Sequence, residues 1–166
     1  TCSVYGANDH VLDERSARNP VSLYARTKID AERVLMSMSG EDFAPVLLRF
    51  ATVYGLSPRP RFDLVINLLA AMAVKEGKIT IFGGDQWRPF VHVEDVGKAI
   101  VKCLEAPIST VRGEAFNVGS DEQNYQIAGI GETIAELIPE AQVNREEGAS
   151  DSRTYNVAFD KIRNRL

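Results

Sequence analysis

Short apolar segments alternate along this chain with longer segments whose apolar residues recur at helical spacing. Strands that alternate with helices indicate βαβ units and a mainly parallel sheet. The pattern therefore predicts the α/β fold class. The predicted strands are residues 45–51, 79–82, 90–93, 115–118, a short one at Val143, and 155–157; the predicted helices are residues 23–38, 62–74, 94–104, 125–138, and from Phe159 onward.

The two ends of the sequence have an unusual form. The first six residues, TCSVYG, are typical of the end of a strand entered from a preceding segment, and no Met opens the chain. The last residues stop just as a helical pattern begins. We therefore expect this chain to be a piece of a longer protein.

Charge and composition exclude several classes of partner. Nineteen Lys and Arg against 23 Asp and Glu give a net charge of −4. Sustained affinity for nucleic acid or an anionic membrane usually requires a basic excess. The longest apolar stretch, residues 64–74, is too short to span a bilayer. We therefore expect neither nucleic acid nor membrane as a partner.

The two cysteines, Cys2 and Cys103, can form neither a disulfide framework nor a four-ligand zinc site. This usage fits a reducing compartment, and we expect a cytoplasmic protein. His92 alternates with valines and has only the distant His10 as a second histidine, so a structural role is favoured over a metal site. Cys103 is predicted to pack in the core, and nothing in the sequence positions a base beside Cys2.

Tyr24 and Lys28 are the most informative pair for chemistry. Residues four apart on a helix lie on one face, so the phenol and the ammonium point to the same region. A phenol with an ordinary pKa of about 10 is a poor base at neutral pH, but a nearby cation favours the phenolate. The pair could therefore act as a general acid/base on a hydroxyl, with Thr1 as a second hydroxyl donor. A Y-x-x-x-K spacing alone also occurs by chance on helix surfaces.

The sequence blocks around Tyr24 and Lys28 distinguish this pair from a chance Y-x-x-x-K spacing. They are, in order, TCSVYG at 1–6, YARTKIDAE at 24–32, LRFATVYG at 48–55, NL at 67–68, IFGG at 81–84, RPFVHVED at 88–95, FNVG at 116–119 and DSRTY at 151–155. This succession, over nearly the whole chain, closely resembles the extended short-chain dehydrogenase/reductase superfamily. Within it, the match is to the NAD-dependent nucleotide-sugar epimerase/dehydratase branch.

The resemblance implies a fold and an organisation into domains. It implies the C-terminal part of a Rossmann-like, doubly wound parallel sheet plus a small α/β substrate-binding subdomain. Residues 1–58 would be the Rossmann-like part with the catalytic helix. Residues 59–166 would be mostly the nucleotide-sugar subdomain, with residues 90–118 returning to the sheet. The longer protein is expected to be a homodimer through helices such as the one at 24–38.

One part of the family pattern is missing. The Gly-rich dinucleotide turn of this branch precedes these blocks by roughly a hundred residues, and nothing here replaces it. Gly129-Ile-Gly131 lies inside a helical pattern and lacks the third glycine, so we assign it to helix packing. We therefore expect the missing N-terminal half to be a partner, and the chain alone to be inactive.

The resemblance also implies residue roles. Thr1, Tyr24 and Lys28 would be catalytic. Tyr24, Lys28, Phe50 and Ala51 would lie at the nicotinamide of NAD; NADP is not excluded, because that preference is read in the missing half. The residues implied for the nucleotide sugar are Thr52, Asn67, Leu68, Ile81, Phe82, Arg88 and Asp151.

Two arginines have competing interpretations. Arg49 follows an apolar strand, and we favour a structural salt bridge at the end of the sheet. Arg88 resembles the arginine that clamps the diphosphate, a task suited to a planar fork of donors. Its competing assignment is a surface ion pair.

Departures from the family pattern guide the choice of reaction. Thr52 stands where many relatives have Asn, a departure that concerns a substrate contact. Cys2-Ser3 stands where the 4,6-dehydratases carry acidic residues, which favours epimerisation or simple oxidation and reduction over dehydration. We therefore expect an NAD-dependent nucleotide-sugar epimerase acting at C4 through a 4-keto sugar. The alternatives are a reductase or dehydratase of the same branch, or a noncatalytic nucleotide-sugar-binding module.

Overall fold

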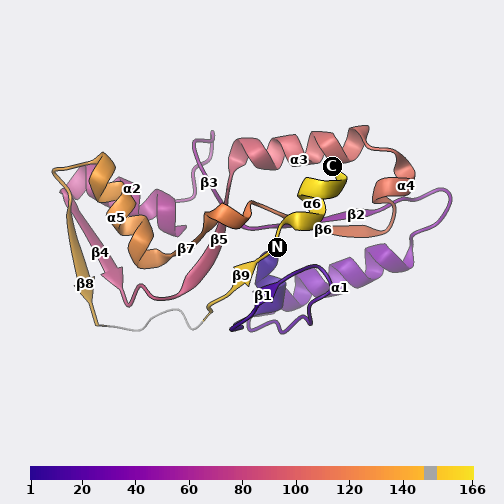
Figure 1. The fold of residues 1–166 in the computed structure, drawn as a ribbon, viewed down its shortest axis with the longest axis horizontal. Helices are drawn as coiled ribbons and strands as arrows, with labels where there is room; N and C mark the ends of the chain where they lie inside the picture. The colour runs from indigo at the N-terminus through magenta and orange to yellow at the C-terminus, as the bar shows by residue number, and fades with distance from the viewer. Residues whose placement is uncertain (148–152) are drawn as a thin grey trace.

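A computed structural model gives the fold, and it describes residues 1–147 and 153–166 (Figure 1). The α-helices are α1 (Leu23–Ser37), α2 (Val65–Glu76), α3 (Val93–Glu105), α4 (Ile108–Val111), α5 (Ile127–Leu137) and α6 (Asp160–Arg165). The strands are β1 (Val11–Leu12), β2 (Val46–Phe50), β3 (Thr52–Tyr54), β4 (Lys78–Phe82), β5 (Trp87–His92), β6 (Glu114–Val118), β7 (Asn124–Gln126), β8 (Gln142–Glu146) and β9 (Asn156–Val157). The predicted α/β class is confirmed.

The first of two lobes in the fold is built on a parallel pair of strands, β2 and β6. β2 and β6 run in register from Val46 opposite Glu114 to Phe50 opposite Val118. Figure 1 shows α1 and α3 on opposite sides of this pair. Strands that are covered on both faces in this way are typical of α/β sheets. The main buried core here contains Val4, Tyr5, Ile29, Ala51, Val91, Val118, Tyr155, Val157 and Phe159.

A second lobe has its own core. β4 and β8 pair in parallel, from Lys78 opposite Gln142 to Phe82 opposite Glu146, and α2 and α5 lie beside them (Figure 1). A Cβ added at Gly131 would meet Ile81 Cδ1 at 2.3 Å. α5 therefore approaches β4 closely at this glycine, as expected if the G-x-G serves helix packing. The second core comprises Leu69, Ala73, Ile79, Ile81, Phe90, Ile127, Ile130, Ile134 and Ala141.

β5 joins the two lobes. Its last residues pair in parallel with β3, and its first residues pair antiparallel with β7. The predicted strand at 90–93 is therefore longer at its start, and it ends at His92 because the His92 side chain caps α3. Gly55, which follows β3, has a φ of 114°, and a Cβ there would meet the His92 ring at 2.5 Å. A glycine is therefore required where β3 ends.

α1 forms as the sequence predicts. The Ser22 hydroxyl accepts a hydrogen bond from the amide of Ala25 at 3.1 Å, which satisfies one free donor of the first turn. The helix ends at Ser37, one residue before the predicted end. Its buried residues are Ala25, Ile29 and Glu32, so one polar side chain lies on the inner face.

The predicted strand end at residues 1–6 is wrong. Cys2–Tyr5 is instead a 3₁₀ helix, η1, and Thr1 is its N-cap. The Thr1 hydroxyl accepts from the Ser3 amide at 3.3 Å, and Gly6 ends the turn with a φ of 70°. Local capping therefore outweighs the strand-like composition of these residues.

Two predicted helices begin later than expected. The helix predicted at 62–74 is Val65–Glu76, because Leu64 is extended and Gly77 adopts the left-handed conformation that ends it. The helix predicted at 125–138 begins at Ile127, because Tyr125 pairs with Arg88 in the β7–β5 ladder. In the part of the chain that the structure describes, no helix is both long and apolar enough to cross a membrane.

Candidate active site

A cleft of about 920 Å³ runs between the two lobes. Its volume lies within the range of small-molecule and cofactor sites. Residues from η1, α1, β2, β3, the start of α2, and β5 line it, together with Arg153 and Tyr155. Most of the predicted site residues meet here: Thr1, Tyr24, Lys28, Phe50, Ala51, Thr52, Asn67 and Arg88.

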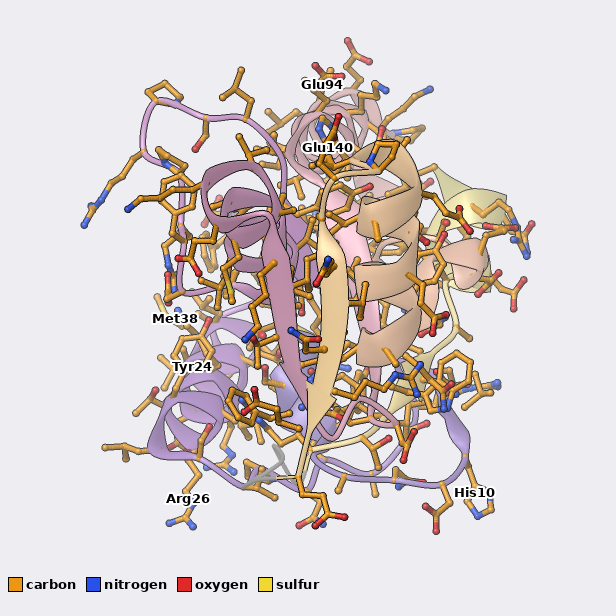
Figure 2. All side chains as sticks on the ribbon, turned by 90° about the vertical axis from the view of Figure 1, so that its left-hand side faces the viewer. His10, Tyr24, Arg26, Met38, Glu94 and Glu140 are labelled. Atoms are coloured by element: carbon orange, nitrogen blue, oxygen red, sulfur yellow. The ribbon has the colours of Figure 1, made fainter. Side chains whose placement is uncertain are left out.

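Tyr24 and Lys28 present their polar ends to the cleft from one face of α1. Lys28 Nζ lies 5.5 Å from the centre of the Tyr24 ring, and Tyr24 is 55% exposed. Figure 2 shows Tyr24 and Arg26 leaving the helix in different directions, so the cleft-facing side of α1 is the Tyr24 side. A phenol and an ammonium are thus available together to a molecule in the cleft.

Thr1 and Ser3 supply two hydroxyls from η1. The Thr1 hydroxyl donates to Ser3 Oγ at 3.2 Å, and both residues line the cleft. Cys2, between them, points inward and its thiol donates to the Arg49 carbonyl at 3.1 Å. Burial raises the pKa of the Cys2 thiol to about 12. Cys2 is therefore neither a cleft residue nor an available thiolate.

Arg88 lines the cleft and is 8% exposed. Its guanidinium donates to the carbonyl of Trp87 at 2.8 Å and to the carbonyl of Arg153. It also lies 5.3 Å from the centre of the Tyr155 ring. These contacts hold the guanidinium in place beside the cleft.

Further cations line the cleft. Arg59, Arg61 and Arg153 also line it. Arg61 is paired with Asp63, whose carboxylate accepts from the Arg61 Nε at 2.8 Å. Among the described lining residues Asp63 is the only carboxylate, so a protein with an excess of acidic residues presents a basic surface here. Such a surface suits an anionic ligand.

Three predicted ligand residues lie outside the lining of the cleft. Ile81 is 2% exposed and belongs to the second core, because its position on β4 faces α5. Phe82, next on the strand, is half exposed on the opposite face, and Leu68 is exposed on α2. Strand alternation thus prevents Ile81 and Phe82 from facing the same ligand. Asp151 lies outside the described residues.

Arg49 and Glu32 form a buried ion pair behind the cleft. Arg49 Nε donates to Glu32 Oε1 at 3.0 Å, and the terminal nitrogen donates to Oε2 at 2.8 Å. Burial alone would raise the pKa of Glu32, but the hydrogen bonds and charge of Arg49 outweigh it, so the pKa is lowered. The predicted structural role of Arg49 is confirmed.

His92 has a structural role, as predicted. Its Nδ1 accepts from the Glu94 amide at 3.4 Å, which caps α3, and its ring packs 5.3 Å from that of Tyr54. Figure 2 shows the other histidine, His10, at the surface of the molecule. Across residues 1–147 and 153–166, no group of three His, Cys, Asp or Glu side chains is placed to hold a metal ion.

The residue-by-residue prediction missed several cleft residues. Ser3 follows Thr1 by two positions, and a helical turn rather than a strand brings both hydroxyls to the same surface. Arg153 and Tyr155 fall in the DSRTY block, in which the sequence resemblance assigns a role only to Asp151. Arg59 and Arg61 lie between β3 and α2, and only their charge could have indicated an anion site.

Comparison with known proteins places these features in a family context. The model of the NAD dependent epimerase/dehydratase family matches residues 1–119. The uncharacterized UDP-glucose epimerase YtcB of Bacillus subtilis is 35% identical over 125 residues, which are 74% of this chain and 38% of that protein. The dTDP-D-glucose 4,6-dehydratase of Homo sapiens is 29% identical over 149 residues, covering 88% of this chain and 41% of that protein.

A solved structure gives the same picture. The UDP-glucuronic acid 4-epimerase of Bacillus cereus, in complex with UDP-glucuronic acid and NAD, superposes with a TM-score of 0.83 at 27% identity. The superposition covers 100% of this chain and 53% of that one. The chain therefore spans about half, or less, of the length of these relatives. Both epimerases and dehydratases are among them.

Proposed function

Because this chain belongs to the NAD dependent epimerase/dehydratase family, we propose that its full-length protein is an NAD-dependent nucleotide-sugar 4-epimerase. The observation that carries the proposal is the meeting of Thr1, Tyr24, Lys28 and Arg88 in one cleft. An acid/base pair and an anion-binding arginine are then available to a single substrate.

Tyr24 is the proposed acid/base. Its phenol is half exposed in the cleft and can take the proton of a sugar hydroxyl. Lys28, one helical turn away, places an ammonium 5.5 Å from the centre of the same ring. Thr1, which also lines the cleft, offers a second hydroxyl that can hydrogen-bond the same oxygen and hold it during proton transfer.

The cleft fits the nicotinamide end of NAD. Lys28 can donate to ribose hydroxyls, and Phe50 and Ala51 line the adjoining wall. When bound, NAD supplies a reversible acceptor for the hydrogen of the sugar carbon. The described residues supply no Gly-rich turn for the diphosphate of NAD, because Gly129 and Gly131 lie within α5. The rest of the cofactor site is assigned to the half that the relatives carry and this chain does not.

The arginines that line the cleft, and Arg88 in particular, would hold the diphosphate of the nucleotide sugar. Arg88 is pre-oriented there by two backbone carbonyls and the Tyr155 ring. A guanidinium that is already ordered loses little freedom when it binds a planar or tetrahedral anion. Asn67, whose amide donates to the Arg61 carbonyl at 3.1 Å, also lines the cleft.

The scarcity of acidic groups in the described lining of the cleft favours epimerisation over 4,6-dehydration. Dehydration needs one acid to expel a hydroxyl and a base to remove a second proton. Among the described lining residues the only carboxylate is Asp63, and it is paired with Arg61. Next to Thr1 the chain offers the Ser3 hydroxyl and the buried Cys2 thiol, neither of which is a good proton donor at neutral pH.

The test is a product assay on the full-length protein. UDP-glucose, UDP-glucuronic acid and dTDP-glucose are each incubated with the enzyme, and the sugar products are identified by NMR. The proposal expects a 4-epimer without net consumption of NAD, and loss of that product in Tyr24→Phe. A 4-keto-6-deoxy product indicates a dehydratase, and net oxidation or reduction of the cofactor indicates a dehydrogenase or reductase. Tight binding without any product indicates a noncatalytic binding protein. Each of these three results overturns the proposal.

A further inference from the structure

One face of α1 carries both exposed and buried polar residues. Tyr24, Lys28 and Glu32 are spaced by four residues and therefore lie along one side of the helix. The first two are exposed in the cleft, whereas Glu32 is 8% exposed. The same stripe that presents the acid/base pair thus ends in a buried carboxylate.

The buried carboxylate is fixed in orientation by Arg49 on β2. Both oxygens of Glu32 accept from Arg49, at 3.0 Å and 2.8 Å, and Arg49 is 5% exposed. Arg18 donates to the same carboxylate at 3.3 Å. A two-point contact of this kind restricts rotation as well as distance, because both parallel hydrogen bonds must form together. The contact with Arg49 therefore restricts the rotation of α1 about its own axis.

The same guanidinium is connected to η1. The remaining terminal nitrogen of Arg49 donates to the Tyr5 hydroxyl at 2.9 Å, and Tyr5 donates to Asn117 Oδ1 on β6 at 2.7 Å. Tyr5 is fully buried and is the last residue of the 3₁₀ helix that Thr1 caps. At the other end of η1, the Cys2 thiol donates to the Arg49 carbonyl. Arg49 therefore contacts both elements that carry the proposed catalytic groups.

The energetics favour one arrangement. A buried ion pair that loses one partner leaves an uncompensated charge, which is strongly unfavourable. A rotation or shift of α1 that separates Glu32 from Arg49 would have this consequence. α1 and η1 are thus held at a fixed offset by a small polar network within an otherwise apolar core.

From this geometry we propose that the network Glu32–Arg49–Tyr5 is a positioning device for catalysis. It fixes the position of α1, which carries Tyr24 and Lys28, relative to η1, which Thr1 caps. Glu32, Arg49 and Tyr5 are positioning residues, since they act through the elements that carry the reacting groups. This inference rests on the proposed function.

The test compares variants of the full-length protein in the epimerase assay. Glu32→Gln keeps the size of the side chain but removes the charge that orients Arg49. Tyr5→Phe keeps the buried ring and the ion pair but removes the hydrogen bond from the Arg49 guanidinium to η1. Arg49 retains the Glu14 carbonyl at 3.3 Å as a partner. The matched control is Asp30→Asn, which breaks the exposed Asp30–Arg33 pair on the same helix.

The expected result is a change in kcat rather than in KM. Misplacement of a reacting group by about 1 Å can reduce turnover by about a hundredfold, so kcat should fall at least about tenfold in Glu32→Gln. We expect a fall of about threefold or more in Tyr5→Phe, which disturbs only one of the two elements. KM should stay within about twofold in both, because Arg88, the residue proposed to bind the nucleotide, lies on β5 and outside this network. Asp30→Asn should leave both constants within about twofold.

Circular dichroism, with rates expressed per folded molecule, separates this role from simple stabilisation. If folded Glu32→Gln and Tyr5→Phe turn over like Asp30→Asn, the positioning role is overturned; a rise in KM that matches the fall in kcat also overturns it. If Glu32→Gln does not fold, Tyr5→Phe decides alone. Tyr24→Phe in the same assay separates the two proposals, because retained turnover there contradicts the proposed function itself.

Discussion

Lys28 Nζ lies 5.5 Å from the centre of the Tyr24 ring, one helical turn further along α1. The helix itself creates this relationship, since side chains four residues apart are neighbours on any α-helix. The proximity of the two side chains therefore requires little beyond the helical state of residues 23–37. The position of this pair relative to Thr1, by contrast, depends on the packing of α1 against η1.

Gly131 and Gly129 allow a matched test of the packing between α5 and β4. A Cβ at position 131 would collide with Ile81 in a closely packed core, so Gly131→Ala should lower the free energy of unfolding by about 1–2 kcal/mol. A Cβ at position 129 has no neighbour within 4 Å, so Gly129→Ala should raise it by about 0.5 kcal/mol. Urea unfolding of both variants measures the difference. Equal effects of the two substitutions would contradict the packing role of this G-x-G.

The Cys2 thiol should be unreactive in the folded protein. Only the thiolate reacts readily, and burial raises the pKa of this thiol to about 12. Burial also raises the pKa of Cys103, which is 9% exposed. Thiol labelling at neutral pH should therefore be slow for both residues until denaturant is added. A Cys103→Ser variant isolates Cys2, and rapid labelling of the native variant would contradict the buried position of η1.

Helices and strands with strong local patterns could be predicted from the sequence. α1 has a capping serine and an apolar stripe. β2 is a mainly apolar run that follows Pro45, and β4 is one that lies between Gly77 and Gly83. The first six residues could not be assigned in this way. Their composition suits a strand, but the Thr1 cap and the φ of 70° at Gly6 produce a 3₁₀ turn.

The candidate site was predictable where a motif fixes geometry locally. The Tyr24–Lys28 spacing is of this kind, and the arginine in RPF reaches the cleft from β5. Ile81 was assigned to a ligand, yet its direction depends on which face of β4 is covered by α5. The Glu32–Arg49 pairing joins residues 17 positions apart on different elements. Only tertiary structure could reveal such a partner.

Glu32 should contribute to stability in a pH-dependent manner. Its pKa in the folded protein lies below the ordinary value of 4.5, so the folded state binds fewer protons than the unfolded state. The stabilisation is complete above about pH 4.5 and is lost as the pH falls through the lower, folded-state pKa. Unfolding free energies of the wild type should therefore fall more steeply below this pH than those of Glu32→Gln. Parallel curves for the two proteins would contradict this, and Asp30→Asn is the control for an exposed carboxylate.

Arg88 should act on substrate binding rather than on turnover. Arg88→Lys keeps the positive charge but loses the planar fork that two carbonyls orient. In the full-length protein we expect KM for the nucleotide sugar to rise about tenfold, with kcat changed by less than about threefold. Steady-state kinetics measure both constants, and Arg145→Lys, on the surface of the second lobe, is the matched control. An unchanged KM would remove Arg88 from the proposed binding site.

The most direct measurement is turnover of the full-length protein with Tyr24 replaced by Phe. The substitution removes one hydroxyl from a half-exposed ring, so folding and nucleotide-sugar binding should be preserved. We predict that epimerisation falls by at least about a hundredfold, as expected for loss of the general acid/base. Turnover within about threefold of the wild type, in a variant that binds the sugar nucleotide normally, would contradict the central role given to this tyrosine.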